Sequence, residues 1–212
     1  MPLSPFFSDI DHLHRSFPGR IFGASAMPSF PPEQSSPQAG ETSLTTGTGL
    51  RLRVRPAIAA DEGALETFFV HVTLEDLRFR FLSAVQHVGH DQIAAMLRAD
   101  QARTETFLAY EENGTLVGVA TLAADDTGET AEVAVSVHRD WKAQGIGWSL
   151  LRYVAQIARA KGISRLQSIE SRDNHAAIEV ERDLGFSARA YPGDPTLILV
   201  EADLRGGAAS GT

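Results

Sequence analysis

The chain has 212 residues, of which 43% are hydrophobic and 22% charged, as expected for one globular domain with a substantial core. Its net charge of −8 and its lack of a lysine and arginine cluster argue against nucleic acid as a partner. Cysteine is absent, which excludes disulfides, a thiol nucleophile and zinc held by cysteine. No apolar run approaches the ~20 residues that span a bilayer, and no secretory signal begins the chain, so we expect a cytoplasmic protein without membrane contact.

Residues 1–48 are rich in proline, serine, glycine and threonine and show neither a helical nor a strand period. This composition predicts a disordered or loosely packed N-terminal tail. Five phenylalanines in the segment leave open a second interpretation, in which it packs as an arm on its own domain or on a partner subunit. We expect the folded domain to cover residues 49–205, followed by a frayed C-terminus over 206–212.

The first half of the domain begins with alternating residues over 50–55, which predict a strand closed by Pro56. Three helical segments are expected next, over 60–72, 74–82 and 90–103. Strands over 106–111 and 115–123 are joined by Asn113-Gly114, a strong hairpin signal, and a third strand covers 130–138.

The second half alternates helix and strand. We expect helices over 146–161 and 174–184, and strands over 165–170, 186–191 and 196–202. The first of these helices has one continuous apolar face and ends at Gly162. The order predicts an α/β fold of the α+β kind, with a central mixed, mostly antiparallel sheet and helices on its faces.

The turn between the strand ending at 138 and the helix beginning at 146 reads Lys142-Ala143-Gln144-Gly145-Ile146-Gly147. Glycines let backbone N–H groups approach a ligand closely, and a helix start adds partial positive charge. No acidic residue occurs from 141 through 160. The turn therefore predicts a site for an anion such as a pyrophosphate, although glycines that serve only tight packing remain an alternative.

A dinucleotide-binding fold also places Gly-x-Gly between strand and helix, with an acid at the end of the next strand, where Glu170 stands. Three observations oppose that interpretation. Leu150 occupies the place of the third glycine, the preceding strand belongs to an antiparallel meander, and too little chain follows Glu170 for a second half.

The segment 50–204 resembles the GNAT superfamily of N-acetyltransferases. The family's acyl-CoA motif is similar to residues 142–147, with Lys142 in place of the usual arginine or glutamine. A second family motif is matched by Asn174-His175-Ala176-Ala177, followed by Leu184-Gly185-Phe186. The runs over 74–81 and 131–135 also resemble the bacterial protein-lysine acetyltransferase branch.

This resemblance implies acetyl-CoA as co-substrate, with no metal. The backbone of Val135 and Val137 would pair with the pantetheine, and amides over 144–148 would hold the pyrophosphate. Asn174 would bond the pantetheine or a water near the sulfur, unless it serves as a plain helix N-cap, and both roles are compatible. The residues expected to bind the coenzyme are Val135, Val137, Lys142, Gln144, Gly145, Ile146, Gly147, Trp148, Asn174 and Ala177.

Glu132 is the candidate general base, because it is an acid in an otherwise apolar strand leading to the turn. A partly desolvated site would raise its pKa and its basicity, whereas a solvent-facing glutamate on an alternating strand is the plainer alternative. Asn174 is the second expected catalytic residue. Many relatives carry a tyrosine as the acid for the leaving thiolate where this chain has Glu181, so Ser171, Tyr191, water or unaided departure would have to replace it.

These observations predict an N-acyltransferase that moves an acetyl group from CoA to a primary amine by direct attack, with protein lysine favoured as acceptor. A small amine or amino acid is the alternative acceptor. A protein that binds acyl-CoA without catalysis is the alternative of another class.

Overall fold

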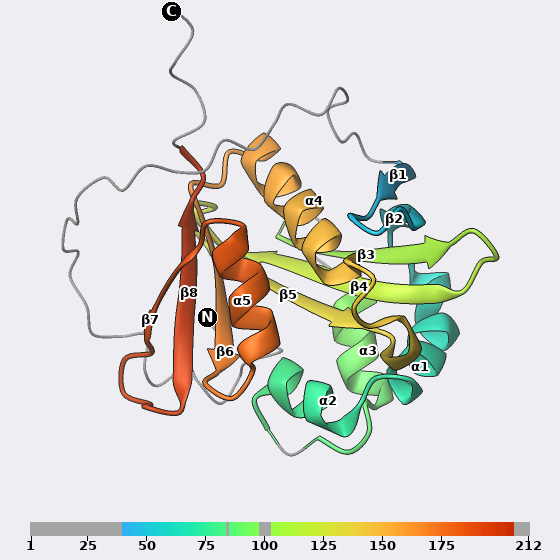
Figure 1. Ribbon diagram of the computed structural model, residues 1–212, viewed down its shortest axis with the longest axis horizontal. Coiled ribbons are helices and arrows are strands. Elements are labelled where there is room, and N and C mark those ends of the chain that lie inside the picture. The colour runs from blue at the N-terminus through green and yellow to red at the C-terminus, as the bar shows by residue number, and fades with distance from the viewer. Residues whose placement is uncertain (1–39, 84, 98–102, 206–212) are drawn as a thin grey trace, which may run out of the picture.

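The computed structural model describes residues 40–83, 85–97 and 103–205, so residues 1–39 of the expected tail and the expected terminus over 206–212 lie outside them. One eight-stranded sheet has the order β1–β2–β3–β4–β5–β6–β8–β7 (Figure 1). All neighbours are antiparallel except β5 and β6, so the predicted mixed sheet is confirmed. The strands are β1 (Thr42–Thr45), β2 (Arg51–Pro56), β3 (Thr104–Glu111), β4 (Leu116–Ala124), β5 (Thr130–Val137), β6 (Arg165–Ser171), β7 (Ser187–Ala190) and β8 (Leu197–Asp203).

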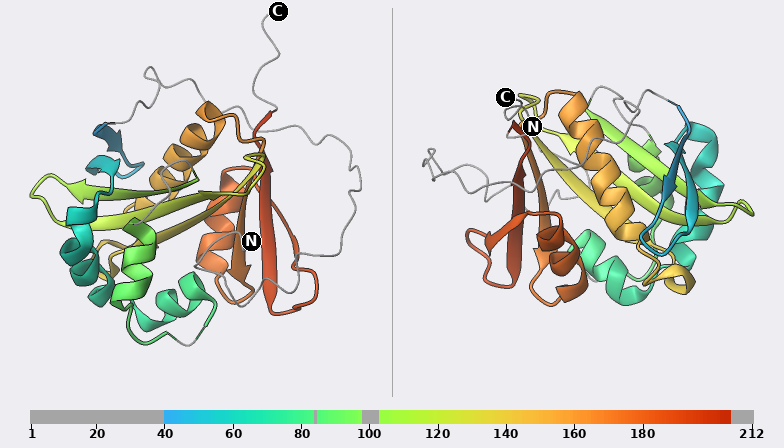
Figure 2. Two further views of the ribbon diagram at one scale, coloured as in Figure 1. Left: turned by 180° about the vertical axis from the view of Figure 1, so that it is seen from behind. Right: turned by 45° about the horizontal axis from the view of Figure 1, so that its top comes forward.

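Helices cover both faces of the sheet, as Figure 2 shows from two further sides. α4 and α5 lie on one face, α1 and α3 on the other, and α2 lies beyond the ends of β5 and β6 (Figure 1). The helical elements are η1 (Ala59–Asp61), α1 (Glu62–Val70), α2 (Leu74–Phe81), α3 (His90–Leu97), η2 (Arg139–Trp141), α4 (Ile146–Ala160) and α5 (His175–Asp183). No helix in the described part of the chain combines the length and apolar character needed to cross a membrane.

The long helix α4 packs unusually close to the sheet at Gly118 of β4. A Cβ atom at Gly118 would lie 2.7 Å from Leu150 Cδ1 and 3.0 Å from Ile146 Cγ2. Ile146, Leu150 and Val154 are buried in the core between helix and sheet. The missing side chain at Gly118 therefore sets how near the start of α4 comes to the end of β5.

The neighbouring strands β5 and β6 separate after a short pairing. β5 and β6 are in register only from Thr130 opposite Arg165 to Glu132 opposite Gln167. On its other side, β5 stays paired with β4 through Val137. The second half of β5 therefore keeps one strand neighbour and loses the other, and the sheet opens there.

The sequence prediction placed residues 42–48 in the tail, and this part of it is wrong. Thr42–Thr45 forms β1, which pairs with β2 from Thr42 opposite Val54 to Thr45 opposite Arg51. Leu44 is buried in the main core, and β1 covers the edge of β2 that would otherwise be open. Four residues with one apolar side chain are too short a pattern to predict a strand, so the boundary expected at residue 49 is too late.

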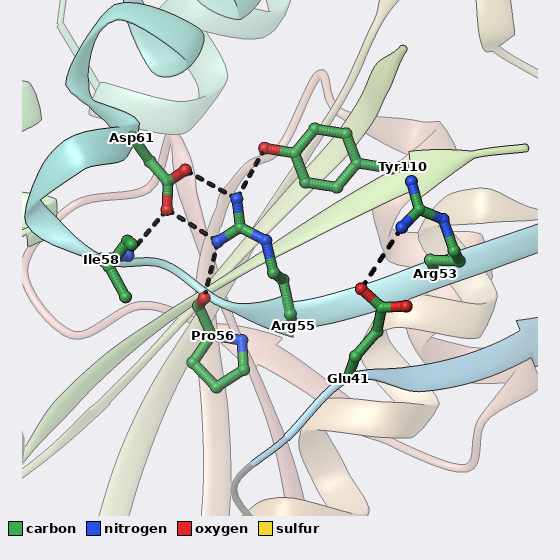
Figure 3. A network of polar contacts seen from close by, with 7 residues as sticks. All are labelled: Glu41, Arg53, Arg55, Pro56, Ile58, Asp61 and Tyr110. Atoms are coloured by element: carbon green, nitrogen blue, oxygen red, sulfur yellow. Dashed lines mark hydrogen bonds and ion pairs between the residues drawn. The ribbon is translucent and has the colours of Figure 1, made fainter. Parts of the chain in front are cut away.

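A polar network fixes the passage from β2 to α1 (Figure 3). Arg55 donates from Nη1 and Nη2 to the two carboxylate oxygens of Asp61 at 2.8 and 2.7 Å. Asp61 also accepts from the backbone N–H of Ile58 at 2.8 Å, and Arg55 reaches the Tyr110 hydroxyl on β3 at 3.2 Å. The hydrogen bonds from Arg55 hold the pKa of Asp61 below its usual range, so the carboxylate stabilises the fold in its charged form.

Gly118→Ala is expected to destabilise the protein by about 1–3 kcal/mol, because the new methyl group overpacks the contact with Leu150. Gly63→Ala is the matched control, since Gly63 lies in α1 and a Cβ there meets nothing within 4 Å. The control should gain roughly 0.5–1 kcal/mol from helix propensity. Urea unfolding measures both, and an unchanged midpoint for Gly118→Ala would contradict the close approach of α4.

Asp61→Asn is expected to lower the free energy of unfolding at neutral pH by ~1–3 kcal/mol, the worth of hydrogen bonds between charged groups. Because the folded pKa of Asp61 is depressed, its stabilisation exists above the unfolded pKa and is lost as pH falls through the folded one. The difference between wild type and variant should therefore shrink below about pH 4. Urea unfolding against pH measures it, with the exposed Glu66→Gln on α1 as control; a difference independent of pH would argue against the ion pair.

Candidate active site

A cavity of about 440 Å³ occupies the opening between β5 and β6. Its walls come from four parts of the chain: α2, the second half of β5, the turn with the first residues of α4, and the end of β6 with α5. Its lining residues include Asp76, Arg80, Val135, Val137, Lys142, Gly145, Gly147, Trp148, Leu151, Glu170, Asn174 and Glu181.

One end of the cavity is the turn before α4. Gly145 has φ of +74° and Ala143 has φ of +58°, so the backbone twice enters the left-handed region. The N–H of Ser149 makes the first helical hydrogen bond, to the Gly145 carbonyl at 3.0 Å. The N–H groups before Ser149 thus belong to the open first turn of a helix that has no acidic residue there. This arrangement offers hydrogen-bond donors and partial positive charge to an anion.

The hairpin of β1 and β2 supports this turn from behind. Thr48 Oγ1 donates to the Gln144 carbonyl at 2.9 Å. A Cβ at Gly145 would lie 3.4 Å from Thr46 Cβ and 3.5 Å from the backbone N of Gly47. These residues were expected in the tail, so no sequence signal connects them with the anion site.

Lys142 lies at the rim of the cavity but already has a partner. Its Nζ is 2.6 Å from Asp76 Oδ2 on α2, and 46% of its side chain is exposed. Asp76 also accepts from the Thr73 hydroxyl. The pair connects α2 to the turn across the rim, so a ligand phosphate would compete with Asp76 for this ammonium group.

The structure brings most of the predicted site residues together. Val135, Val137, Lys142, Gly145, Ile146, Gly147, Trp148, Asn174 and Ala177 all line the cavity. Gln144 is exposed outside the cavity lining and contributes its carbonyl to the contact with Thr48.

Asn174 is the N-cap residue of α5. Its Oδ1 accepts from the N–H of Ala177 at 3.4 Å, and its Nδ2 donates to Glu170 Oε2 at 2.6 Å. The side chain therefore joins the start of α5 to the end of β6 at the cavity wall.

Glu132 lies next to the cavity rather than on its wall. Glu132 as a whole is half-buried. Its Oε1 atom is buried from solvent and accepts no hydrogen bond from the described residues. Burial raises the pKa of Glu132 to about 7, against the opposing charge of Arg80. A solvent-facing glutamate does not fit this environment, whereas a carboxyl group that titrates near neutrality does.

Sequence reasoning missed that two further carboxylates and a guanidinium gather at the other end of the cavity. Burial and the charge of Glu181 raise the pKa of Glu170 to about 8. Burial also raises the pKa of Glu181 to about 7, and Arg80, whose charge acts on Glu170, is 8% exposed. The available signal was helical spacing, because Glu181 follows the buried Ile178 by three residues on the same helix face.

A family model described as the acetyltransferase (GNAT) family matches residues 58–186. The chain belongs to the GNAT family. Acetyltransferase PA5475 of Pseudomonas aeruginosa is 25% identical to this GNAT chain over 154 residues, which are 71% of this chain and 83% of that protein.

Solved structures show the same GNAT fold. The GNAT domain of S. lividans PAT aligns with a TM-score of 0.71 at 22% identity, over 77% of this chain and 96% of that one. The protein yncA of Salmonella typhimurium, solved with its cofactor acetyl-CoA, aligns with a TM-score of 0.59 at 23% identity, over 74% and 96%. The match to the family confirms the resemblance carried by residues 142–147 and 174–186.

The expectation of no metal stays a prediction. In the described residues His71, His138 and Asp140 each place one ligand atom within 4.8 Å of the others. His138 Nδ1 accepts from the backbone N–H of Asp140 at 3.2 Å, and Arg139 Nη2 lies 3.3 Å from His71 Nδ1. A guanidinium in this position opposes a cation.

The two glycines of the GNAT turn are expected to respond in opposite ways to alanine. Gly145→Ala should destabilise the protein by about 1–2 kcal/mol, because its left-handed φ disfavours a Cβ. Gly147→Ala places its methyl 3.8 Å from Val137 Cγ2, an ordinary contact within the helix, and should be neutral or slightly stabilising. Urea unfolding of both variants measures this, and equal losses would contradict the strained turn.

Proposed function

We propose that this protein is an acetyl-CoA-dependent N-acetyltransferase that transfers the acetyl group to a primary amine, with protein lysine as preferred acceptor. The observation that carries the proposal is one cavity with a helix start at one end and buried carboxyl groups at the other. The first end suits the coenzyme's diphosphate, and the second suits proton transfer.

The residues of the cavity fit acetyl-CoA along its length. The left-handed turn at Gly145 and the acid-free start of α4 would hold the diphosphate. Beyond Glu132, the edge of β5 has no strand partner among the described residues on the side of β6, so backbone groups near Val135 and Val137 are available to the pantetheine amides. Asn174, between α5 and β6, would orient the thioester end.

In the proposed reaction a neutral amine attacks the thioester carbonyl, so a lysine ammonium must first lose its proton. Glu132 would accept that proton. Its raised pKa of about 7 keeps it partly ionised at neutral pH and makes it a far better base than an ordinary glutamate. Because Glu132 lies behind the cavity wall, we propose that it acts through a water molecule.

Protein lysine is preferred over a small amine because residues 74–81 and 131–135 resemble the protein-lysine branch. Both runs lie at the site: α2 supplies Asp76 and Arg80 to the cavity, and β5 carries Glu132. The buried carboxyl groups are compatible with either cationic acceptor, so an amine panel that includes proteins, amino acids and polyamines has to decide.

Glu132→Gln is expected to lower kcat by about 10²–10⁴-fold, the usual contribution of a general base, while acetyl-CoA still binds. Wild-type kcat should fall as pH drops through the pKa of Glu132 near 7, because only the ionised form accepts a proton. Steady-state rates against pH and calorimetric titration with acetyl-CoA measure these effects.

Glu129→Gln is the matched control, because Glu129 is exposed just before β5. A wild-type rate in Glu132→Gln would exclude Glu132 as the base. Binding of acetyl-CoA by the wild type without turnover of any amine would instead support an acyl-CoA-binding protein. No heat with acetyl-CoA would contradict the coenzyme itself.

A further inference from the structure

We propose that Glu181, paired with Glu170 in the cavity wall, is the acid that protonates the CoA sulfur as it leaves. The inference rests on the proposed acetyl transfer and assigns it a second proton-transfer group. Glu181 would touch the departing thiolate, and Glu170 would act through Glu181 as a positioning residue.

Glu181 is a buried residue in the wall of the cavity. It lies on α5, is 4% exposed and lines the cavity. Its Oε1 accepts a hydrogen bond from the Ser168 hydroxyl on β6. Its Oε2 is buried and accepts no hydrogen bond from the described residues. A buried carboxyl oxygen without a partner is costly when charged, so this oxygen is a favourable place for a proton.

Glu170 strengthens that preference. It lines the same cavity from β6, and its Oε2 accepts from Asn174 Nδ2 at 2.6 Å. The charge of each buried carboxylate opposes ionisation of the other, as the raised pKa of Glu170 shows. The pair therefore keeps a proton at neutral pH, and the titration belongs to the pair.

Other charged groups around the pair do not cancel this effect. Arg80 on α2 acts on both Glu170 and Glu132, so its single positive charge is shared between two carboxylates. On α4, the cavity residues Trp148 and Leu151 are uncharged, and the Arg152 guanidinium lies over the Trp148 ring at 4.8 Å from its centroid.

The charged and polar groups on β7 and β6, which also lie near α5, do not remove the proton that Glu170 and Glu181 share. On β7, Arg189 pairs with Glu201 at 2.8 Å. Ser168 on β6 donates a hydrogen bond to Glu181, and this bond favours the charged form of Glu181 without overcoming burial. The pKa of Glu181 accordingly stays raised, at about 7.

The proton balance of the step is complete. The amine nitrogen bonds to the acetyl carbon, and the carbon–sulfur bond breaks with both electrons going to sulfur. Glu132 has already passed the ammonium proton to solvent, so it accepts the second proton, which nitrogen loses as the amide forms. The proton of Glu181 goes to sulfur, which leaves as the thiol. Glu181 is then an anion and regains a proton from Glu170 or from solvent, while Glu132 releases its own.

The matching of acidities makes Glu181 suited to this step. A thiol has a pKa of ~8.5, and a proton donor works best when its own pKa lies near the operating pH. An ordinary glutamate, with a pKa of ~4.3, would already be ionised at neutral pH and could give no proton. Burial raises the pKa of Glu181 and removes that obstacle.

Glu181→Gln tests the proposal, because it keeps the size of the side chain and an oxygen for Ser168 but holds no transferable proton. Wild-type kcat should decline at alkaline pH, where Glu181 loses the proton that it donates. In the variant we expect this alkaline decline to disappear and kcat to fall at least tenfold, with KM for acetyl-CoA within about twofold of the wild type. Glu179→Gln on the exposed side of α5 is the matched control and should leave all three unchanged.

Ser168→Ala provides the second, independent readout. The Ser168 hydroxyl stabilises the anion of Glu181, so its removal should raise the pKa of that carboxyl group and move the alkaline decline of kcat to higher pH. The acidic limb, assigned to Glu132, should stay in place. This variant decides the question if circular dichroism shows that Glu181→Gln does not fold.

Wild-type kcat and an intact alkaline decline in a folded Glu181→Gln would overturn the assignment, as would an unmoved decline in Ser168→Ala. Either result leaves acetyl transfer itself standing. Absence of turnover by the wild type with every amine would remove the proposed function and this inference together.

Discussion

The separation of β5 and β6 is the constraint on which the rest of the structure depends. Three residue pairs, ending at Glu132 opposite Gln167, hold the two halves of the sheet together before the strands diverge. In the part of the chain that the structure describes, the divergence leaves the second half of β5 without a strand neighbour on one side, within an otherwise continuous sheet. Unpaired backbone groups in a sheet interior are unfavourable unless something else binds them, and that requirement makes this place a natural ligand site.

Packing around the opening sets what such a ligand meets. Gly118 lets α4 approach the sheet closely, and the β1–β2 hairpin supports the turn at Gly145 from behind. The start of α4 is thereby fixed against the free part of β5. At the opposite end Asn174 fixes the start of α5 against β6. Both helix starts are held by contacts that are independent of a ligand, so the site is largely formed in advance.

Three glutamates with buried carboxyl groups and one buried arginine lie in or next to the cavity. Burial raises the pKa of Glu132, Glu170 and Glu181, and the guanidinium of Arg80 acts on Glu132 and Glu170. Because these carboxyl groups are buried without full charge compensation, they stay partly protonated at neutral pH. The same environment that costs stability gives the site groups able to take and give protons close to pH 7.

The order of helices and strands was predictable from the sequence, because apolar periodicity, the Asn113-Gly114 hairpin and the glycine at the end of α4 are local signals. The anion turn was equally readable, since its glycines and its lack of acids are consecutive in the chain. β1 was not, because its stability comes from pairing with β2 rather than from its own four residues. The ion pair of Lys142 with Asp76 was also hidden, as it joins segments 66 positions apart in the chain. The sequence by itself thus determined the elements, their order and the turn chemistry, which arise from neighbouring residues. Only the tertiary structure decided where the sheet opens and which carboxyl groups share the cavity, because burial and pairing of charges depend on residues that meet through folding.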